Sequence, residues 1–138
     1  MSVVHVAVGV VLNSQNEVLI ALRAKQAHQG GLWEFPGGKV EVDETVQQAL
    51  VRELKEELDI IAECFKPLVV IEHDYGDKTV QLDVWLVTQF DGVPFGCEGQ
   101  QVKWAEIDEL TGHEFPAANE KIIEDILSAR ASGLLSDI

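Results

Sequence analysis

Residues 46–58 are the segment that most constrains this fold, because acidic side chains there share a helix face with apolar ones. At about 100° per residue, the apolar side chains of the segment gather on one stripe, formed by Ala49, Leu50 and Leu54. Glu53 and Glu57 fall inside that stripe, and Glu56 lies at its edge. Like charges this close destabilise one another, and loss of solvent increases the cost. We therefore expect these carboxylates to be compensated, either by protons or by a metal ion.

The sequence around this helix is also strongly acidic. Residues 41–59 contain seven acidic and two basic side chains. A charge run of this kind often marks only a solvated helix face, and the apolar stripe argues against that alternative. Carboxylate oxygens at this density suit Mg²⁺ or Mn²⁺, and Mg²⁺ is commonly shared between one or two carboxylates and the phosphates of a substrate.

The pattern of apolar runs and turn residues predicts alternating strands and helices. The 138 residues are the size of one domain, so we expect a single domain over 1–138. Extended runs joined around Gly76-Asp77 predict a hairpin. The chain is thus predicted to be an α/β protein with a mixed sheet flanked by helices. The predicted strands are 3–12, 17–22, 33–35, 65–74, 78–90 and 102–104, and the predicted helices are 44–58 and 119–130.

The net charge of the chain argues against anionic binding partners. The chain carries 10 Lys and Arg against 24 Asp and Glu, a net charge of −14. Nucleic acid polymers and anionic membranes repel such a chain at long range, so we expect neither as a partner. A polyphosphate ligand would need divalent cations between itself and the protein. The sequence shows neither a membrane-spanning apolar run nor a basic leader, and we expect a cytoplasmic monomer.

One motif makes the prediction specific. Gly38, Glu44 and the run Arg52-Glu53-Leu54-Lys55-Glu56-Glu57-Leu58-Asp59-Ile60 resemble the Nudix box, the signature of hydrolases that cut nucleoside diphosphates linked to another group. Asp59 is the position that departs from the motif, because that family usually has Gly there. This position follows the helix end and commonly needs a left-handed conformation, which Asp adopts at a cost of about 1 kcal/mol. The resemblance implies the Nudix fold, an α/β/α sandwich with a central mixed sheet.

The same resemblance implies a metal site and catalytic residues. It implies Mg²⁺, with Mn²⁺ as a substitute, and these ligands: the carbonyl of Gly37 with Glu53, Glu56, Glu57 and Glu98. The implied catalytic residues are Glu53, Glu98, Arg52 and Glu44. Glu53 would orient or deprotonate the attacking water, and Arg52 would pair with Glu44 and tie the loop to the helix. Glu98 lies among glycines that permit a mobile loop able to close over metal and water.

Matches outside the box narrow the resemblance to one branch of the family. They are Val6-Ala7-Val8-Gly9, Arg23-Ala24, Ala27-His28, Glu34 to Lys39, Glu98-Gly99-Gln100 and Phe115 to Glu120. These segments are similar to the MutT-like branch, whose members hydrolyse 8-oxo-dGTP. The resemblance implies these substrate-binding residues: Arg23, Phe35, Gly38, Lys39 and Asn119. An amide at Asn119 can pair with the N7–H and O6 of the oxidised base, and the alternative is that Asn119 caps the last helix.

The function expected from the sequence is Mg²⁺-dependent hydrolysis of 8-oxo-dGTP to 8-oxo-dGMP and pyrophosphate. This reaction keeps oxidised guanine out of DNA synthesis. Two alternatives remain. One is a Nudix pyrophosphohydrolase of another nucleoside triphosphate or of a dinucleoside polyphosphate. The other is a non-catalytic nucleotide-binding module, which predicts loss of the box acids, whereas Glu53, Glu56 and Glu57 are all present.

Overall fold

The computed structural model describes residues 3–23 and 31–132. Ala24 and the matched pair Ala27-His28 therefore lie outside the described residues. Among the helices that are described, none combines the length and the hydropathy needed to cross a membrane.

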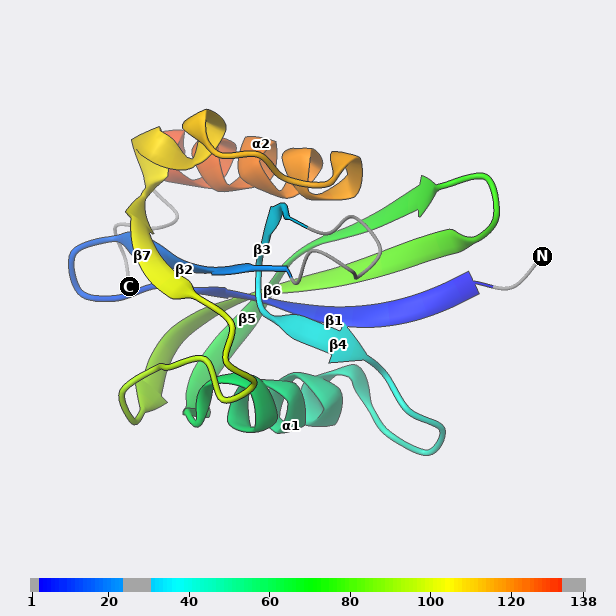
Figure 1. Ribbon diagram of the computed structural model, residues 1–138, viewed down its shortest axis with the longest axis horizontal. Coiled ribbons are helices and arrows are strands. Elements are labelled where there is room, and N and C mark those ends of the chain that lie inside the picture. Colours follow the sequence, from blue (N-terminus) through cyan, green and yellow to red (C-terminus); the bar gives the residue numbers. More distant parts are fainter. Residues whose placement is uncertain (1–2, 24–30, 133–138) are drawn as a thin grey trace.

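The strands form two sheets (Figure 1). The first has the order β4-β1-β6-β5, and it is mixed because β1 pairs parallel to β6 whereas the β4-β1 and β5-β6 pairs are antiparallel. Its strands are β1 (Val3–Val11), β4 (Gly37–Lys39), β5 (Ile61–Asp74) and β6 (Thr79–Asp91). The second sheet is antiparallel, in the order β3-β2-β7, with strands β2 (Glu17–Leu22), β3 (Trp33–Glu34) and β7 (Val102–Glu106). A bridge between Leu12 and Val18 links the two sheets.

Helices cover the two sides of this sheet layer. α1 (Val46–Leu58) lies on one side and α2 (Ala117–Ala131) on the other, preceded by the short 3₁₀ helix η1 (Ile107–Gly112) (Figure 1). The predicted α/β/α sandwich with a central mixed sheet is thus confirmed. The separate three-stranded sheet was not anticipated from the sequence.

The alternation of β1 divides the core between the two helices. Val8 and Val10 pack in the cluster that contains Ile122 and Ile126 of α2. Ala7 and Val11 pack instead with the apolar stripe of α1, which is fully buried at Ala49, Leu50, Leu54 and Leu58. Burying both faces of one strand explains why its sequence is apolar almost without interruption.

Several element boundaries differ from the predictions; α2, for example, spans Ala117–Ala131 rather than 119–130. α1 begins at Val46 rather than at 44, because Thr45 is its N-cap and forms a capping box with Gln48. Gly37 and Gly38, to which the sequence assigned no element, belong to the strand β4, because they pair with β1. β5 starts at Ile61 rather than at 65, with register shifts against β6 near Ala62, Cys64 and Pro67. The left-handed conformation expected at Asp59 is present, with φ 57° and ψ 39°.

Candidate active site

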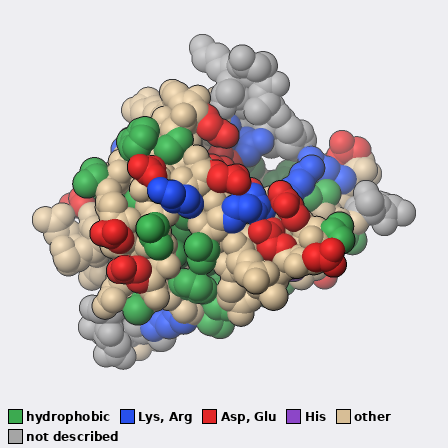
Figure 2. Space-filling view, turned by 90° about the horizontal axis from the view of Figure 1, so that it is seen from below, with side chains coloured by type: hydrophobic (Ala, Val, Ile, Leu, Met, Phe, Trp, Pro, Cys, Tyr) green, Lys and Arg blue, Asp and Glu red, His purple; other side chains and the backbone are tan. Residues whose placement is uncertain are grey.

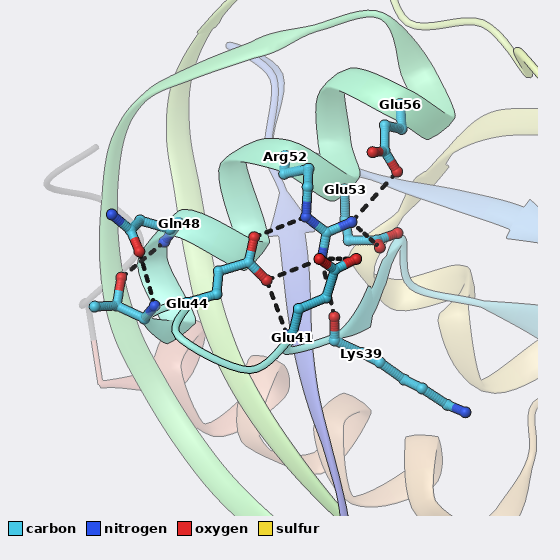
Figure 3. Close-up of polar contacts among 8 residues, drawn as sticks. Lys39, Glu41, Glu44, Gln48, Arg52, Glu53 and Glu56 are labelled. Carbon is cyan, nitrogen blue, oxygen red and sulfur yellow. Dashed lines mark hydrogen bonds and ion pairs between the residues drawn. The ribbon is translucent and has the colours of Figure 1, made fainter.

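Arg52 organises the acidic face of α1. Its Nε and Nη2 atoms donate to both carboxylate oxygens of Glu44, at 2.7 and 3.0 Å, as the sequence predicted for this pair. Its Nη1 atom donates to Glu53 at 2.7 Å and to Glu56 at 3.3 Å. The Nη2 atom also donates to the carbonyl oxygen of Lys39 at 3.0 Å, which joins α1 to β4 (Figure 3). One guanidinium therefore connects the loop before the helix, the helix and the strand beneath it.

This arrangement changes the acidity of Glu44. Hydrogen bonds from Arg52, and then the backbone N–H of Glu41, lower the pKa of Glu44 to about 2. The Glu44 side chain is 14% exposed, so its charge is held by Arg52 more than by solvent.

Glu57 is the carboxylate that most needs compensation. Burial raises its pKa to about 8, although the N–H of Gly37 donates to its Oε2 atom at 3.1 Å and opposes that rise. The negative charges of Glu34, Glu53 and Glu98 raise the pKa further. At neutral pH a lone Glu57 would therefore hold a proton, which a bound cation would displace.

The two glycines of β4 let the carboxylates of α1 lie directly against the sheet. A Cβ atom at Gly38 would overlap the carboxylate of Glu53, and one at Gly37 would overlap the carbonyl oxygen of Ala7. Gly37 also has a φ of 155°, which side chains rarely adopt. Gly37 therefore requires glycine, whereas a side chain at Gly38 would displace the carboxylate of Glu53. Both glycines also line the cavity described below.

The acidic residues differ in exposure, as the helix pattern predicted. The Glu53 side chain is 16% exposed, whereas that of Glu56 is 58% exposed. On the face that α1 covers, acidic side chains gather around a few basic ones (Figure 2). Within residues 3–23 and 31–132, no three His, Cys, Asp or Glu side chains lie close enough together to hold one ion as they stand. The donor set still fits a hard divalent cation, because it consists of carboxylates whose mutual repulsion is only partly offset by Arg52.

A cavity of about 250 Å³ opens beside these acids. It contains all five residues that the sequence assigned to substrate binding: Arg23, Phe35, Gly38, Lys39 and Asn119. Its apolar wall comes from alternate residues of β1 and β6: Val4, Val6, Val8, Val80 and Leu82. Tyr75 and Lys78, from the β5-β6 hairpin, also line it. The Phe35 ring is buried and stacks on Phe115, with ring centroids 5.2 Å apart.

The position of Asn119 removes its alternative role. The N-cap of α2 is Pro116, and Asn119 is the third residue of the helix, with its backbone N–H bonded to the carbonyl oxygen of Pro116 at 2.9 Å. Asn119 therefore does not cap the helix. Its side chain belongs to the lining of the cavity.

Glu34 and Gln100 were not singled out from the sequence as site residues. Glu34 forms an ion pair with Arg23 in the cavity wall. Burial raises the pKa of Glu34, while Arg23 opposes the rise. In the sequence, the position of Glu34 directly before Phe35-Pro36-Gly37-Gly38 could have indicated a role in the site.

Gln100 connects the Glu98 loop to α1.

Comparison with known proteins agrees with this geometry. The model of the NUDIX domain matches residues 7–125, which is most of the chain, and the protein therefore belongs to the Nudix family of hydrolases. Hydrolases of this family generally use a divalent metal.

Relatives with assigned activities lie in the same branch. The chain is 42% identical to the 8-oxo-dGTP diphosphatase of Escherichia coli over 89% of this chain and 95% of that protein. It is 34% identical to the CTP pyrophosphohydrolase of the same organism, over 91% of this chain and 93% of that protein. A solved MutT structure, from work on the Aliivibrio salmonicida and Vibrio cholerae proteins, superposes with a TM-score of 0.83 at 38% identity, covering 92% of this chain and 98% of that one.

The pairing of Glu44 with Arg52 predicts a specific loss of stability in acid. The pKa of Glu44 is about 2 in the folded protein, against an ordinary value of 4.5, so its charge stabilises the fold above about pH 4.5. That stabilisation is lost as the pH falls from about 4.5 towards 2. The Glu44→Gln variant lacks the stabilisation by the Glu44 charge at every pH. Thermal unfolding followed by circular dichroism should therefore show a gap in Tm between wild type and variant that is full at pH 6 and narrows steadily below pH 4.5. A gap that stays constant down to pH 2 would contradict the assignment.

Proposed function

We propose that the protein is a Mg²⁺-dependent 8-oxo-dGTP diphosphatase, with Mn²⁺ as a substitute, which releases 8-oxo-dGMP and pyrophosphate. The observation that supports this proposal most strongly is that β4 lies between the cavity and the acidic side chains of α1. Gly37 and Gly38 line the cavity that holds Phe35 and Asn119, and the same two residues touch the carboxylates of Glu57 and Glu53. A nucleotide whose base occupies the cavity would thus extend its phosphates towards the acidic face of α1.

Base recognition rests on the pattern of donors and acceptors. Guanine presents two acceptors, N7 and O6, on its outer edge, and oxidation at C8 places a hydrogen on N7. The amide of Asn119 offers an oxygen that accepts from N7–H and an NH₂ group that donates to O6. Undamaged guanine would place a lone pair against the amide oxygen, and mismatched buried polar groups of this kind support discrimination of up to about 10⁴–10⁵. The main chain of Phe35, a buried residue that lines the cavity, would meet the base edge.

The charged residues act at the phosphate end. Arg23 and Lys39, which line the cavity, would contact the phosphates or the sugar. The Lys39 side chain points away from Arg52, so its ammonium group is not committed to the acidic cluster (Figure 3). Glu56, Glu57, Glu98 and the carbonyl oxygen of Gly37 are the groups that would hold the cation, together with Glu53. When bound, the cation neutralises the polyphosphate and lowers the pKa of a water molecule.

Glu53 is the residue that would take the proton from the attacking water. Water adds at the β-phosphorus, and the bond to the bridging oxygen breaks so that the nucleoside monophosphate leaves. A base at this place contributes roughly 10²–10⁴-fold. Arg52 donates to Glu53 at 2.7 Å and fixes its carboxylate, while Glu44 holds Arg52. Glu44 and Arg52 thus support the base by positioning it.

Hydrolysis of CTP is the second candidate, because one relative is a CTP pyrophosphohydrolase whose coverage is similar to that of the Escherichia coli diphosphatase. The amide oxygen of Asn119 could also accept from the amino group of cytosine. The intact set of box acids makes a non-catalytic module the least supported alternative.

A competition assay tests the proposal. Equal concentrations of 8-oxo-dGTP, dGTP and CTP are mixed with the protein and Mg²⁺, and the three monophosphate products are quantified by chromatography. We expect 8-oxo-dGMP to dominate and no product to form when Mg²⁺ is removed with EDTA. Dominant CMP would establish the second candidate, and nucleotide binding without pyrophosphate release would establish the non-catalytic one.

Asn119→Ala tests the recognition step separately. Loss of the amide should reduce kcat/KM for 8-oxo-dGTP by roughly 5–150-fold, as expected for about 1–3 kcal/mol per bidentate contact to a base edge. The effect on dGTP should be much smaller, because dGTP cannot satisfy the amide in the wild-type protein. Equal losses on both substrates would show that Asn119 supports the cavity without reading the base.

A further inference from the structure

The loop that carries Glu98 is docked on the C-terminal end of α1. The last carbonyl groups of a helix have no partner within it and must be satisfied from outside. Here the N–H of Cys97 donates to the carbonyl oxygen of Glu57 at 2.9 Å, and the N–H of Phe95 donates to that of Leu58 at 3.2 Å. From the sequence, the glycines around Glu98 permit a mobile loop able to close over metal and water. In the structure, this loop is hydrogen-bonded to the helix.

The side-chain amide of Gln100 links the Glu98 loop to the C-terminal end of α1. Its Oε1 atom accepts from the backbone N–H of Glu98 at 2.9 Å, and its Nε2 atom donates to the carbonyl oxygen of Glu57 at 3.4 Å. The backbones of two candidate metal ligands are therefore bridged by one planar group.

The glycines shape the loop around this amide. A Cβ atom at Gly96 would overlap the carbonyl oxygen of Gln100 and lie 3.0 Å from its Oε1 atom. The N–H of Gly99 donates to the carbonyl oxygen of Gly96 at 3.0 Å and closes the turn, with Gly99 at a φ of 84°. Glycine at 96 and 99 thus permits the tight path that brings the Gln100 side chain back to the helix.

Electrostatics explain why a tether is needed and why it is neutral. The charge of Glu98 acts unfavourably on both Glu57 and Glu34, so repulsion among carboxylates would push the loop away from the helix. A Lys or Arg could hold Glu98 in place, but it would bind the same carboxylates and compete with a cation. An amide supplies the two hydrogen bonds without adding charge.

We propose that Gln100 is a positioning residue, which holds the backbone of Glu98 beside that of Glu57 so that both carboxylates serve one cation–polyphosphate site. The inference rests on the proposed function, because it assigns Glu98 to that site. Gln100 itself contacts neither the nucleotide nor the reacting atoms in this account.

A double-mutant cycle tests the proposal with the variants Gln100→Met, Glu98→Gln and their combination. Met keeps the length of the side chain and removes both hydrogen bonds. Gln101→Met is the matched control, because Gln101 is the adjacent exposed residue of the same type. Mn²⁺ affinity is measured by electron paramagnetic resonance in the presence of the α,β-methylene analogue of dGTP, and amide hydrogen exchange at Glu98 is measured by NMR without metal.

Gln100→Met should weaken Mn²⁺ binding by roughly 10–100-fold, the usual effect of losing a group that orients a metal ligand. It should also speed exchange of the Glu98 amide, while Gln101→Met changes neither quantity. In the Glu98→Gln background, the same change should alter Mn²⁺ affinity by no more than about twofold, because the ligand that it positions is already absent.

Equal losses in the two backgrounds would overturn the proposal, because Gln100 would then act on the fold as a whole. Unchanged exchange at Glu98 would overturn it as well. Gln100→Asn, whose amide is one methylene too short to reach both partners, should reproduce the result and replaces the Met variant if that one does not fold. Neither readout needs turnover, so a wild-type protein that releases no pyrophosphate would refute the proposed function separately.

Discussion

Repulsion among carboxylates crowded between α1 and β4 is the constraint on which the rest of this structure depends. Glu53 and Glu57 lie on the buried side of the helix because Leu50 and Leu54 must face the sheet, and the helical repeat places the acids on the same stripe. Arg52 offsets part of the repulsion by contacting Glu44, Glu53 and Glu56 together. Glu57 is not among its partners, and its pKa is raised, first by burial and then by the negative charges of Glu34, Glu53 and Glu98.

The sheet beneath the helix is adapted to this crowding. β4 is made of Gly-Gly-Lys, and its glycines leave room for the carboxylate of Glu53 on one side and for the cavity on the other. The short strand therefore joins the chemistry of the acids to the recognition surface of Phe35 and Asn119. The Glu98 loop is hydrogen-bonded to the C-terminal end of α1.

Patterns set by local geometry were predictable from the sequence, whereas those set by distant pairing were not. The stripe of α1, the greater exposure of Glu56, the Arg52–Glu44 pair and the left-handed Asp59 all follow from helix geometry or from the Nudix motif. No strand was predicted at Gly37 and Gly38, because local rules cannot show that β1 lies beside them. The sequence allowed Asn119 as the N-cap of the last helix, whereas in the structure the N-cap is Pro116. Gln100 carries no local signal, since its role depends on the end of a helix more than 40 residues away.

The central claim is that a divalent cation compensates these acids, and isothermal titration calorimetry tests it most directly. Mg²⁺ is titrated at pH 7 into the protein bound to a non-hydrolysable nucleotide, in buffers that differ in ionisation enthalpy. Because the pKa of Glu57 is about 8 without metal, the account predicts Mg²⁺ binding with net release of protons, and weaker release in Glu57→Gln. Absence of Mg²⁺ binding, or binding heats that are the same in every buffer, would contradict it.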